Sequence, residues 1–161
     1  MAHKCTSVYR TLQDTGEFAG KTVVWVKLFG CNLECQGFGQ VKLNDPTTWV
    51  RPLDTTDFSV YKSVSEIPVF QTGCDSSHSW SQKVEHLVPT LSAPQIADQI
   101  EACLITPSNE MGKFQHPLTY HEVRLGFTGG EPMLHQSAIR EVVAELSRRG
   151  NAPLYMLVET N

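Results

Sequence analysis

Three cysteines of this sequence have the residue type and the surroundings of metal ligands. Cys31 and Cys35 are separated by three residues and directly follow an apolar run, whereas Cys74 comes much later, before Asp75 and Ser76. Cysteine thiolates are the usual ligands of iron–sulfur clusters. Three of them leave one iron of a four-iron cluster without a protein ligand, and an open iron can bind a substrate. We therefore expect Cys31, Cys35 and Cys74 to hold one catalytic iron–sulfur cluster.

The same cysteines fit two simpler interpretations. They can be three unrelated core thiols, or they can form a zinc site with His78 as the fourth ligand. A zinc-stapled binding module without enzymatic activity is therefore one alternative function. The other two cysteines are less informative: Cys5 has no visible partner, and Cys103 lies on the apolar face of a predicted helix, where a small buried side chain is expected.

A Gly-Gly-Glu-Pro motif at residues 129–132 is the second candidate site. Gly129 and Gly130 suit a backbone that approaches a ligand closely, and Glu131 can accept a hydrogen bond from an ammonium group. Pro132 prevents the preceding strand from continuing. By itself the motif is equally typical of a turn. Beside the cysteines, it predicts a place for an amino-acid moiety next to the open iron.

The apolar pattern predicts the elements that position these residues. Residues 22–29 form a buried strand that ends in the cysteine loop, 122–128 and 154–159 form two more strands, and helices span about 92–104 and 137–149. Ser92 and Gln95 form a capping box at the start of the first helix. The order strand, helix, strand, helix, strand predicts a parallel α/β sheet, whose C-terminal edge is the usual place for ligands.

The other segments lack a regular pattern. We expect a turn-rich lead-in at 6–20 and a long loop insertion at 37–73 without structure of its own. Within the insertion, Val69 and Phe70 are expected to pin the chain so that Cys74 returns to the cysteine loop. The last strand looks buried but no helix follows to cover it. We therefore expect residues 1–161 to form one domain, either the N-terminal part of a larger fold or a unit completed by a partner.

Bulk properties place the chain among cytoplasmic proteins. Its 161 residues, 40% of them hydrophobic, are enough for one domain with a core. A net charge of −4 argues against nucleic acid and against an anionic membrane as partners. No apolar stretch reaches the roughly 20 residues of a membrane helix, and the N-terminus lacks the apolar segment of a signal peptide.

Several motifs resemble those of the radical S-adenosylmethionine superfamily: Gly-Cys-Asn-Leu-Glu-Cys at 30–35, Phe-Thr-Gly-Gly-Glu-Pro-Met-Leu at 127–134 and Glu-Thr-Asn at 159–161. More narrowly, the chain resembles 7-carboxy-7-deazaguanine synthase of the queuosine and deazapurine pathway. Residues 11–20 are similar to the Thr-x-Gln-Gly-Glu-Gly lead-in of that family, and Cys74-Asp75-Ser76 is similar to its Cys-Asp-Thr motif. The resemblance implies a partial (β/α) barrel, of which this chain carries the N-terminal half.

The resemblance also implies a lyase reaction. A 4Fe-4S cluster on the three cysteines would take an electron from a flavodoxin or a ferredoxin and cleave S-adenosyl-L-methionine to a 5′-deoxyadenosyl radical. The radical would convert 6-carboxy-5,6,7,8-tetrahydropterin to 7-carboxy-7-deazaguanine by ring contraction with loss of ammonia, aided by Mg²⁺. A homodimer is implied as well. A second possibility within the superfamily is an activase that makes a glycyl radical on a partner enzyme.

Individual roles follow from the same resemblance. The groups that orient S-adenosylmethionine would be Gly129, Gly130 and Glu131, with Glu159, Thr160 and Asn161 on its methionine or ribose part. The pterin pocket would be lined by Gln13, Glu17 and Lys27, of which Glu17 and Lys27 are the catalytic candidates. Lys27 would pair with the pterin carboxylate, and Ser76 would bind magnesium.

The sequence departs from the family pattern at three places, one of which is Asp14-Thr15 within the Gln-Gly-Glu-Gly lead-in. Phe38 occupies the expected position of the third cysteine, and 38 residues separate Cys35 from Cys74. The cluster motif is therefore either lengthened by an insertion or broken. Lys27 stands where the synthases have arginine, which keeps the positive charge but loses the two-pronged hydrogen-bonding geometry.

Overall fold

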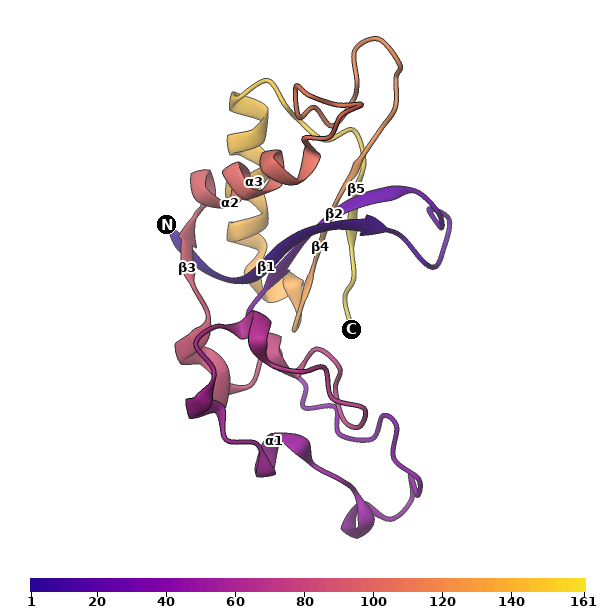
Figure 1. Ribbon diagram of the computed structural model, residues 1–161, viewed down its shortest axis with the longest axis vertical. Helices are drawn as coiled ribbons and strands as arrows, with labels where there is room; N and C mark the ends of the chain where they lie inside the picture. Colours follow the sequence, from indigo (N-terminus) through magenta and orange to yellow (C-terminus); the bar gives the residue numbers. More distant parts are fainter.

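Five strands form one mixed sheet in the computed structural model, which describes residues 1–161 (Figure 1). They are β1 (Ala2–Leu12), β2 (Thr22–Leu28), β3 (Thr90–Ser92), β4 (Arg124–Gly129) and β5 (Met156–Val158). Their order across the sheet is β3-β1-β2-β4-β5. The strands β2, β4 and β5 are parallel, as the sequence predicts. The sheet is not closed into a barrel, because β3 and β5 form its two edges.

The strand β1 corrects the expected turn-rich lead-in at 6–20. It pairs antiparallel with β2 from Cys5 opposite Leu28 to Leu12 opposite Thr22, and the short strand β3 pairs antiparallel with its beginning. Most side chains of β1 are only half-buried, so the sequence carries little apolar alternation. Its strand conformation therefore depends on the neighbouring strand and on the helix that covers it, which are distant in sequence.

The strand β2 is buried on both faces, as predicted. Val24, Val26 and Leu28 belong to the core between the sheet and the helices. Trp25 points to the opposite face and is only 3% exposed. Its ring lies flat against Gly126 of β4, where a Cβ would overlap the ring. Glycine at position 126 thus makes room for the tryptophan.

Two helices, α2 (Ala93–Leu104) and α3 (Gln136–Arg148), cover one face of the sheet (Figure 1). Their bounds agree with the predicted helices to within one residue. The Ser92–Gln95 capping box is confirmed: the Ser92 hydroxyl accepts from the Gln95 amide, and the Gln95 side chain accepts from the Ser92 amide. The buried faces of the helices pack on the strands through Ile96, Ile100, Leu104, Val142 and Leu146.

The segment 37–73 is not a structureless loop. It contains α1 (Pro52–Thr55) and 3₁₀ turns at Pro46–Thr48, Phe58–Val60 and Val64–Glu66. Together with residues up to Val88, which include 3₁₀ turns at Ser77–Ser79 and Gln82–Leu87, it forms the lower part of the molecule in Figure 1. This part has its own small core of Phe29, Phe58, Val64, Ile67, Val84 and Val88.

The strand β5 is exposed rather than buried, which corrects a further expectation. Met156 and Val158 are 53% and 41% exposed at the edge of the sheet. A 3₁₀ turn at Pro132–His135 follows β4 and leads into α3. None of the helices has the length and hydropathy needed to cross a bilayer.

Candidate functional site

The cysteine loop begins where β2 ends. Phe29 donates its amide to Lys4 of β1, and Gly30 donates to Ser79, which ties the loop to both parts of the molecule. Gly30 has a φ of 128°, a conformation that favours glycine. A Cβ at this position would lie 2.9 Å from Nε2 of His135, so a larger residue would displace that ring. The backbone conformation of Gly30 therefore fixes the direction in which the chain leaves β2 toward Cys31.

Cys74 returns to this loop through contacts at the base of the segment 37–73. The Gly73 amide donates to the carbonyl of Phe38 at 2.8 Å. Gly39 packs against the carbonyl of Gln71 so closely that a Cβ would overlap it. The two ends of the segment are thus held together by backbone contacts. The expected pin is correct for Phe70, which packs against the small core of this part, and wrong for Val69, which is 63% exposed.

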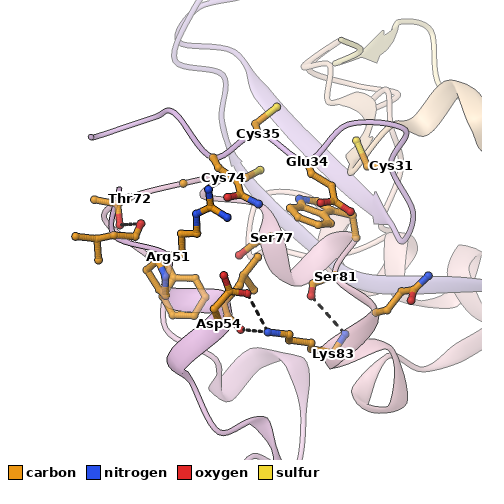
Figure 2. Close-up of a pocket in the computed structure, with 18 residues that line it drawn as sticks. Cys31, Glu34, Cys35, Arg51, Asp54, Thr72, Cys74, Ser77, Ser81 and Lys83 are labelled. Atoms are coloured by element: carbon orange, nitrogen blue, oxygen red, sulfur yellow. Dashed lines mark hydrogen bonds and ion pairs between the residues drawn. The ribbon is translucent and has the colours of Figure 1, made fainter. Parts of the chain in front are cut away.

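The three candidate cysteines line one cavity of about 370 Å³ (Figure 2). Cys31, Cys35 and Cys74 are all free thiols and are partly exposed. Figure 2 shows them along the upper part of the cavity, with Asp54 and Lys83 along the lower part. Burial raises the pKa of the Cys35 thiol, and the nearby Cys74 and Cys31 thiols raise it further. Cys35 is therefore within electrostatic reach of the other two thiols.

The arrangement does not suit a single metal ion. No three His, Cys, Asp or Glu side chains converge as ligands of one ion. His78, the expected fourth zinc ligand, instead places Nε2 3.4 Å from Nζ of Lys27. Zinc needs four ligands around one point, whereas a cubane cluster spreads its cysteines over separate iron atoms. The zinc site with His78 as fourth ligand is therefore not supported, and the three thiols share one cavity.

Lys27 lies beside the segment that follows Cys74. Its ammonium group is half-buried and donates to the Ser76 hydroxyl at 3.2 Å. Burial lowers the pKa of Lys27, while the charges of Asp75, Cys74 and Glu159 oppose that shift. Burial and the Lys27 charge lower the pKa of His78 to about 4, so its ring is neutral near pH 7. Lys27 therefore lies within electrostatic reach of Cys74, whereas its assigned role toward a pterin stays a prediction.

Ser76 is a poor candidate for a magnesium ligand. Its hydroxyl oxygen already accepts from the Lys27 ammonium. A divalent cation at the same oxygen would lie next to that positive charge, and Mg²⁺ usually needs carboxylates or phosphates as well as neutral oxygens. The ammonium group of Lys27 therefore disfavours magnesium at Ser76.

The glycine tip of β4 packs against the cysteine loop rather than against an open space. A Cβ on Gly129 would overlap the backbone of Leu28. A Cβ on Gly130 would overlap the carbonyl of Gly30 and lie 2.8 Å from the Cβ of Cys31. The two glycines therefore allow the ends of two parallel strands to come together. This contact sets the position of Cys31 directly.

Glu131 links the tip to the last residues of the chain. Its carboxylate accepts from the amides of Met133 and Asn161 and from the Thr160 hydroxyl, each at 2.8 Å. Burial opposes the negative charge of Glu131, but these hydrogen bonds outweigh it and lower the pKa of the carboxyl group. Asn161 in turn donates its side-chain amide to Sγ of Cys31 at 3.6 Å. Glu131 and Asn161 thus meet at the cysteine loop, as expected from the ends of parallel strands.

The other predicted residues lie in two places. Glu159 accepts from the Thr128 hydroxyl at 3.1 Å, and its charge acts on Lys27, so it belongs to the same edge of the sheet. Gln13 and Glu17 lie on the loop between β1 and β2, at the start of β2 rather than its end. Lys27 lies near the other end of β2, about 17 Å away along the strand axis. The structure does not bring these two residues to the cysteine cavity.

The sequence did not predict that residues of the segment 37–73 line the cysteine cavity. Arg51 and Asp54 face the cavity from either side of the first turn of α1 (Figure 2). Lys83 closes the lower part by donating to Asp54 at 3.1 Å and to the carbonyl of Leu53 at 2.6 Å. No sequence signal marks these residues, because their contact with the cysteines depends on how the segment folds back.

Comparisons with known proteins give a likeness among solved structures alone. No family model matches the sequence, and no curated protein sequence is similar to it. Among solved structures, the chain is similar to the crystal structure of QueE from Escherichia coli, with a TM-score of 0.48 and 19% sequence identity. The alignment covers 99% of this chain and 53% of that one, so the chain spans about half the length of that structure. A likeness at this level assigns neither a fold family nor an activity.

Proposed function

We propose that this chain is part of a radical S-adenosylmethionine enzyme that resembles 7-carboxy-7-deazaguanine synthase. One observation carries the proposal: cysteine thiols from two distant segments, 31–35 and 74, line a single cavity. That cavity adjoins the C-terminal end of β2, which is parallel to β4. The glycine tip of β4 lies against the same loop. This is the edge at which α/β proteins bind cofactors.

Cys31, Cys35 and Cys74 would hold a 4Fe-4S cluster. When bound, such a cluster would supply the electron that cleaves S-adenosylmethionine. The contribution of the chain itself is to bind and orient the reactants and to exclude water. The amide of Leu33 and the side chain of Asn161 donate toward Sγ of Cys31 at 3.4 and 3.6 Å. Such donors stabilise a thiolate and help to set the properties of a metal centre.

Glu131 would orient the amino group of S-adenosylmethionine. A carboxylate offers about four acceptor positions, and Glu131 uses two on Oε1 and one on Oε2. One position on Oε2 therefore remains for an ammonium group. The lowered pKa keeps the carboxylate charged at neutral pH. Thr160 and Asn161 fix its orientation, so they act as positioning residues.

Lys27 would bind the carboxylate of a pterin substrate. Its half-buried ammonium group lies beside Ser76, and Glu159 is near enough to influence its charge. A single ammonium group fixes the orientation of a carboxylate less tightly than the arginine of the synthases. Gln13 and Glu17 are left out of this pocket, because they lie at the other end of β2. The reductant, a flavodoxin or a ferredoxin, and assembly as a homodimer are part of the same proposal.

The proposal is tested by cofactor cleavage under anaerobic conditions. The protein is reconstituted with iron and sulfide, reduced with dithionite and supplied with S-adenosylmethionine, with and without 6-carboxy-5,6,7,8-tetrahydropterin. We expect 5′-deoxyadenosine to form and the pterin to be converted to 7-carboxy-7-deazaguanine, both measured by liquid chromatography and mass spectrometry. The Cys74→Ala variant should produce neither compound.

Other outcomes separate the alternatives. Cleavage without pterin conversion would retain the superfamily and remove this substrate. Cleavage that requires an added protein partner would indicate an activase of a glycyl-radical enzyme. A reconstituted cluster that never cleaves S-adenosylmethionine would contradict the proposal. A colourless protein that binds one zinc ion would indicate a binding module.

A further inference from the structure

A second cavity lies at the N-terminal ends of β2 and β4, whereas the cysteines lie at the C-terminal ends of these strands. It has a volume of about 370 Å³ and is lined by the start of β2 and by the segment that enters β4. The residues that matter for its chemistry are Lys21, Thr22, Tyr120, His121, Glu122 and Arg124. Tyr120 is the single aromatic or apolar residue in the lining. The chemistry of this cavity is therefore polar and mainly cationic.

Arg124 is the central feature of this cavity. The residue is only 8% exposed, yet none of its N–H groups donates a hydrogen bond, and its Nε is buried without any partner. Its one ionic neighbour is Glu122, whose carboxylate oxygen lies 3.9 Å away. That distance is too long for a hydrogen bond. Buried charged groups are normally hydrogen-bonded, so a guanidinium with one distant ionic neighbour and no hydrogen bond indicates a missing acceptor.

Two aromatic rings hold the guanidinium group of Arg124 without satisfying it. Its central carbon lies 4.8 Å from the ring centre of Phe18 and 5.3 Å from that of Tyr155. Rings of this kind stabilise the cation through its faces. The hydrogen-bond donors of arginine point outward in the plane of the group, where they match carboxylate and phosphate oxygens. The rings therefore fix the plane and leave the donors available.

Two further basic residues, Lys21 and His121, line the same cavity. The Lys21 ammonium group and the His121 ring make no hydrogen bond or ion pair with another residue, and both residues are exposed. Tyr120 adopts a positive φ of 56°, the one non-glycine residue to do so. The loop before it is ordered by His116, whose Nδ1 accepts from the amides of Leu118 and Thr119.

We infer that this cavity, which we call the arginine pocket, binds a small oxyanion: a phosphate or carboxylate group of a small molecule. Arg124 would pair with the anion through its terminal N–H groups, which make no hydrogen bond in the protein. Lys21 would add a second positive charge from the rim, and Thr22 a hydroxyl donor. The site is independent of the proposed reaction, because β2 and β4 separate it from the cysteine cavity along their whole length.

A titration followed by heteronuclear NMR tests the arginine pocket. Inorganic phosphate and acetate are added separately to the chain at constant ionic strength, so that the two sources of an oxyanion are compared. We expect the amide signals of Lys21, His121 and Arg124 to shift with one saturable binding curve. The anion with the lower dissociation constant identifies the preferred group, phosphate or carboxylate.

Variants show whether the pocket itself is responsible. Arg124→Gln should weaken binding at least about tenfold, since a hydrogen-bonded charge pair is lost. Lys21→Gln should weaken it roughly fivefold, as expected for an exposed charge. Because Lys21 is exposed, this variant also carries the test if Arg124→Gln does not fold. The matched control is Lys42→Gln, an exposed lysine of the segment 37–73 that should leave binding unchanged.

Two results would overturn the inference. One is the absence of saturable shifts with either anion. The other is an equal effect of Lys21→Gln and Lys42→Gln, which would indicate general charge screening. Cys74→Ala should bind the anion like the wild-type chain, so a failure of the proposed radical chemistry leaves this result unaffected.

Discussion

The cysteines show how position decides what a residue can do. Cys5 is 1% exposed in the core, and burial raises the pKa of its thiol to about 12. The three cysteines at the cavity are partly exposed, as reactive or metal-binding thiols must be. Cys103 is half-buried, and its Sγ contacts the carbonyl of Val8 at 3.8 Å. Only Cys31, Cys35 and Cys74 therefore remain as candidate ligands.

The buried thiol of Cys5 makes stability depend on pH in the alkaline range. In the unfolded chain a cysteine loses its proton near pH 9.0, whereas folded Cys5 keeps it up to about pH 12. The unfolded state therefore releases a proton first, and the free energy of unfolding falls as pH rises through this window. The expected slope from Cys5 is up to about 1.4 kcal/mol per pH unit.

Urea denaturation between pH 8 and 12 measures this slope for the wild-type chain and for Cys5→Ala; both pH limits are set roughly from the reference and shifted thiol pKa. The variant should lose the contribution of Cys5 and show a shallower dependence. Cys103→Ala removes a less buried thiol and should retain most of the steep fall. An identical pH dependence in the wild-type chain and Cys5→Ala would refute the shifted pKa.

Part of the site could be predicted from residue types and their positions after the predicted strands. Cys31, Cys35 and Glu131 follow parallel strands, so their meeting at one edge could be expected from the strand order. The contact of Lys27 with Ser76 could not, because it depends on how the segment after residue 37 returns. Ser76 was assigned to magnesium from its oxygen alone, whereas its actual neighbour is a positive charge.

The junction of β2 and β4 is the element on which the site depends. Gly129 and Gly130 let the ends of these strands touch, and Gly130 also borders the Cβ of Cys31. The motif was predicted to approach a ligand closely, but what it approaches is the backbone of the cysteine loop. A sequence shows that a glycine permits close contact, and it does not show with what.

Gly130→Ala should destabilise the chain by about 1–3 kcal/mol, because the added methyl group forces the strand ends apart. Thermal or urea unfolding of the chain without a cluster measures the effect. Gly37→Ala is the matched control in the same loop region, since the nearest atom to its Cβ would be a Trp49 carbon at 3.7 Å. Its effect should stay within about 0.5 kcal/mol. Equal effects of both substitutions would show that the junction is not tightly packed.

Elements whose signals are local were predictable, and elements that depend on distant neighbours were not. Ser92 and Gln95 lie three residues apart and cap α2 as expected. The strand β1 was missed because its pairing partner and covering helix supply most of its stability. The small core around Phe58 and Val84 was missed for the same reason, since its members are scattered from residue 29 to residue 88.

At the scale of the whole molecule, the sheet separates two candidate sites. The cysteine cavity lies at the C-terminal ends of β2 and β4, and the arginine pocket lies at their N-terminal ends. The helices cover one face of the sheet, and residues 37–88 form the lower part of the molecule, which shares a small core with Phe29 at the end of β2 (Figure 1). This second part, with its own core, returns Cys74 to Cys31 and Cys35.

The most direct test of the central claim is the iron and sulfide content of anaerobically reconstituted protein. If the three thiols share one cluster, the wild-type chain should contain about four iron and four sulfide ions, with broad visible absorbance. Cys103→Ala should match it, and Cys74→Ala should retain less than about half of the iron, because one of three cysteine ligands is lost. A Cys74→Ala protein with the full complement of iron and sulfide would contradict the account.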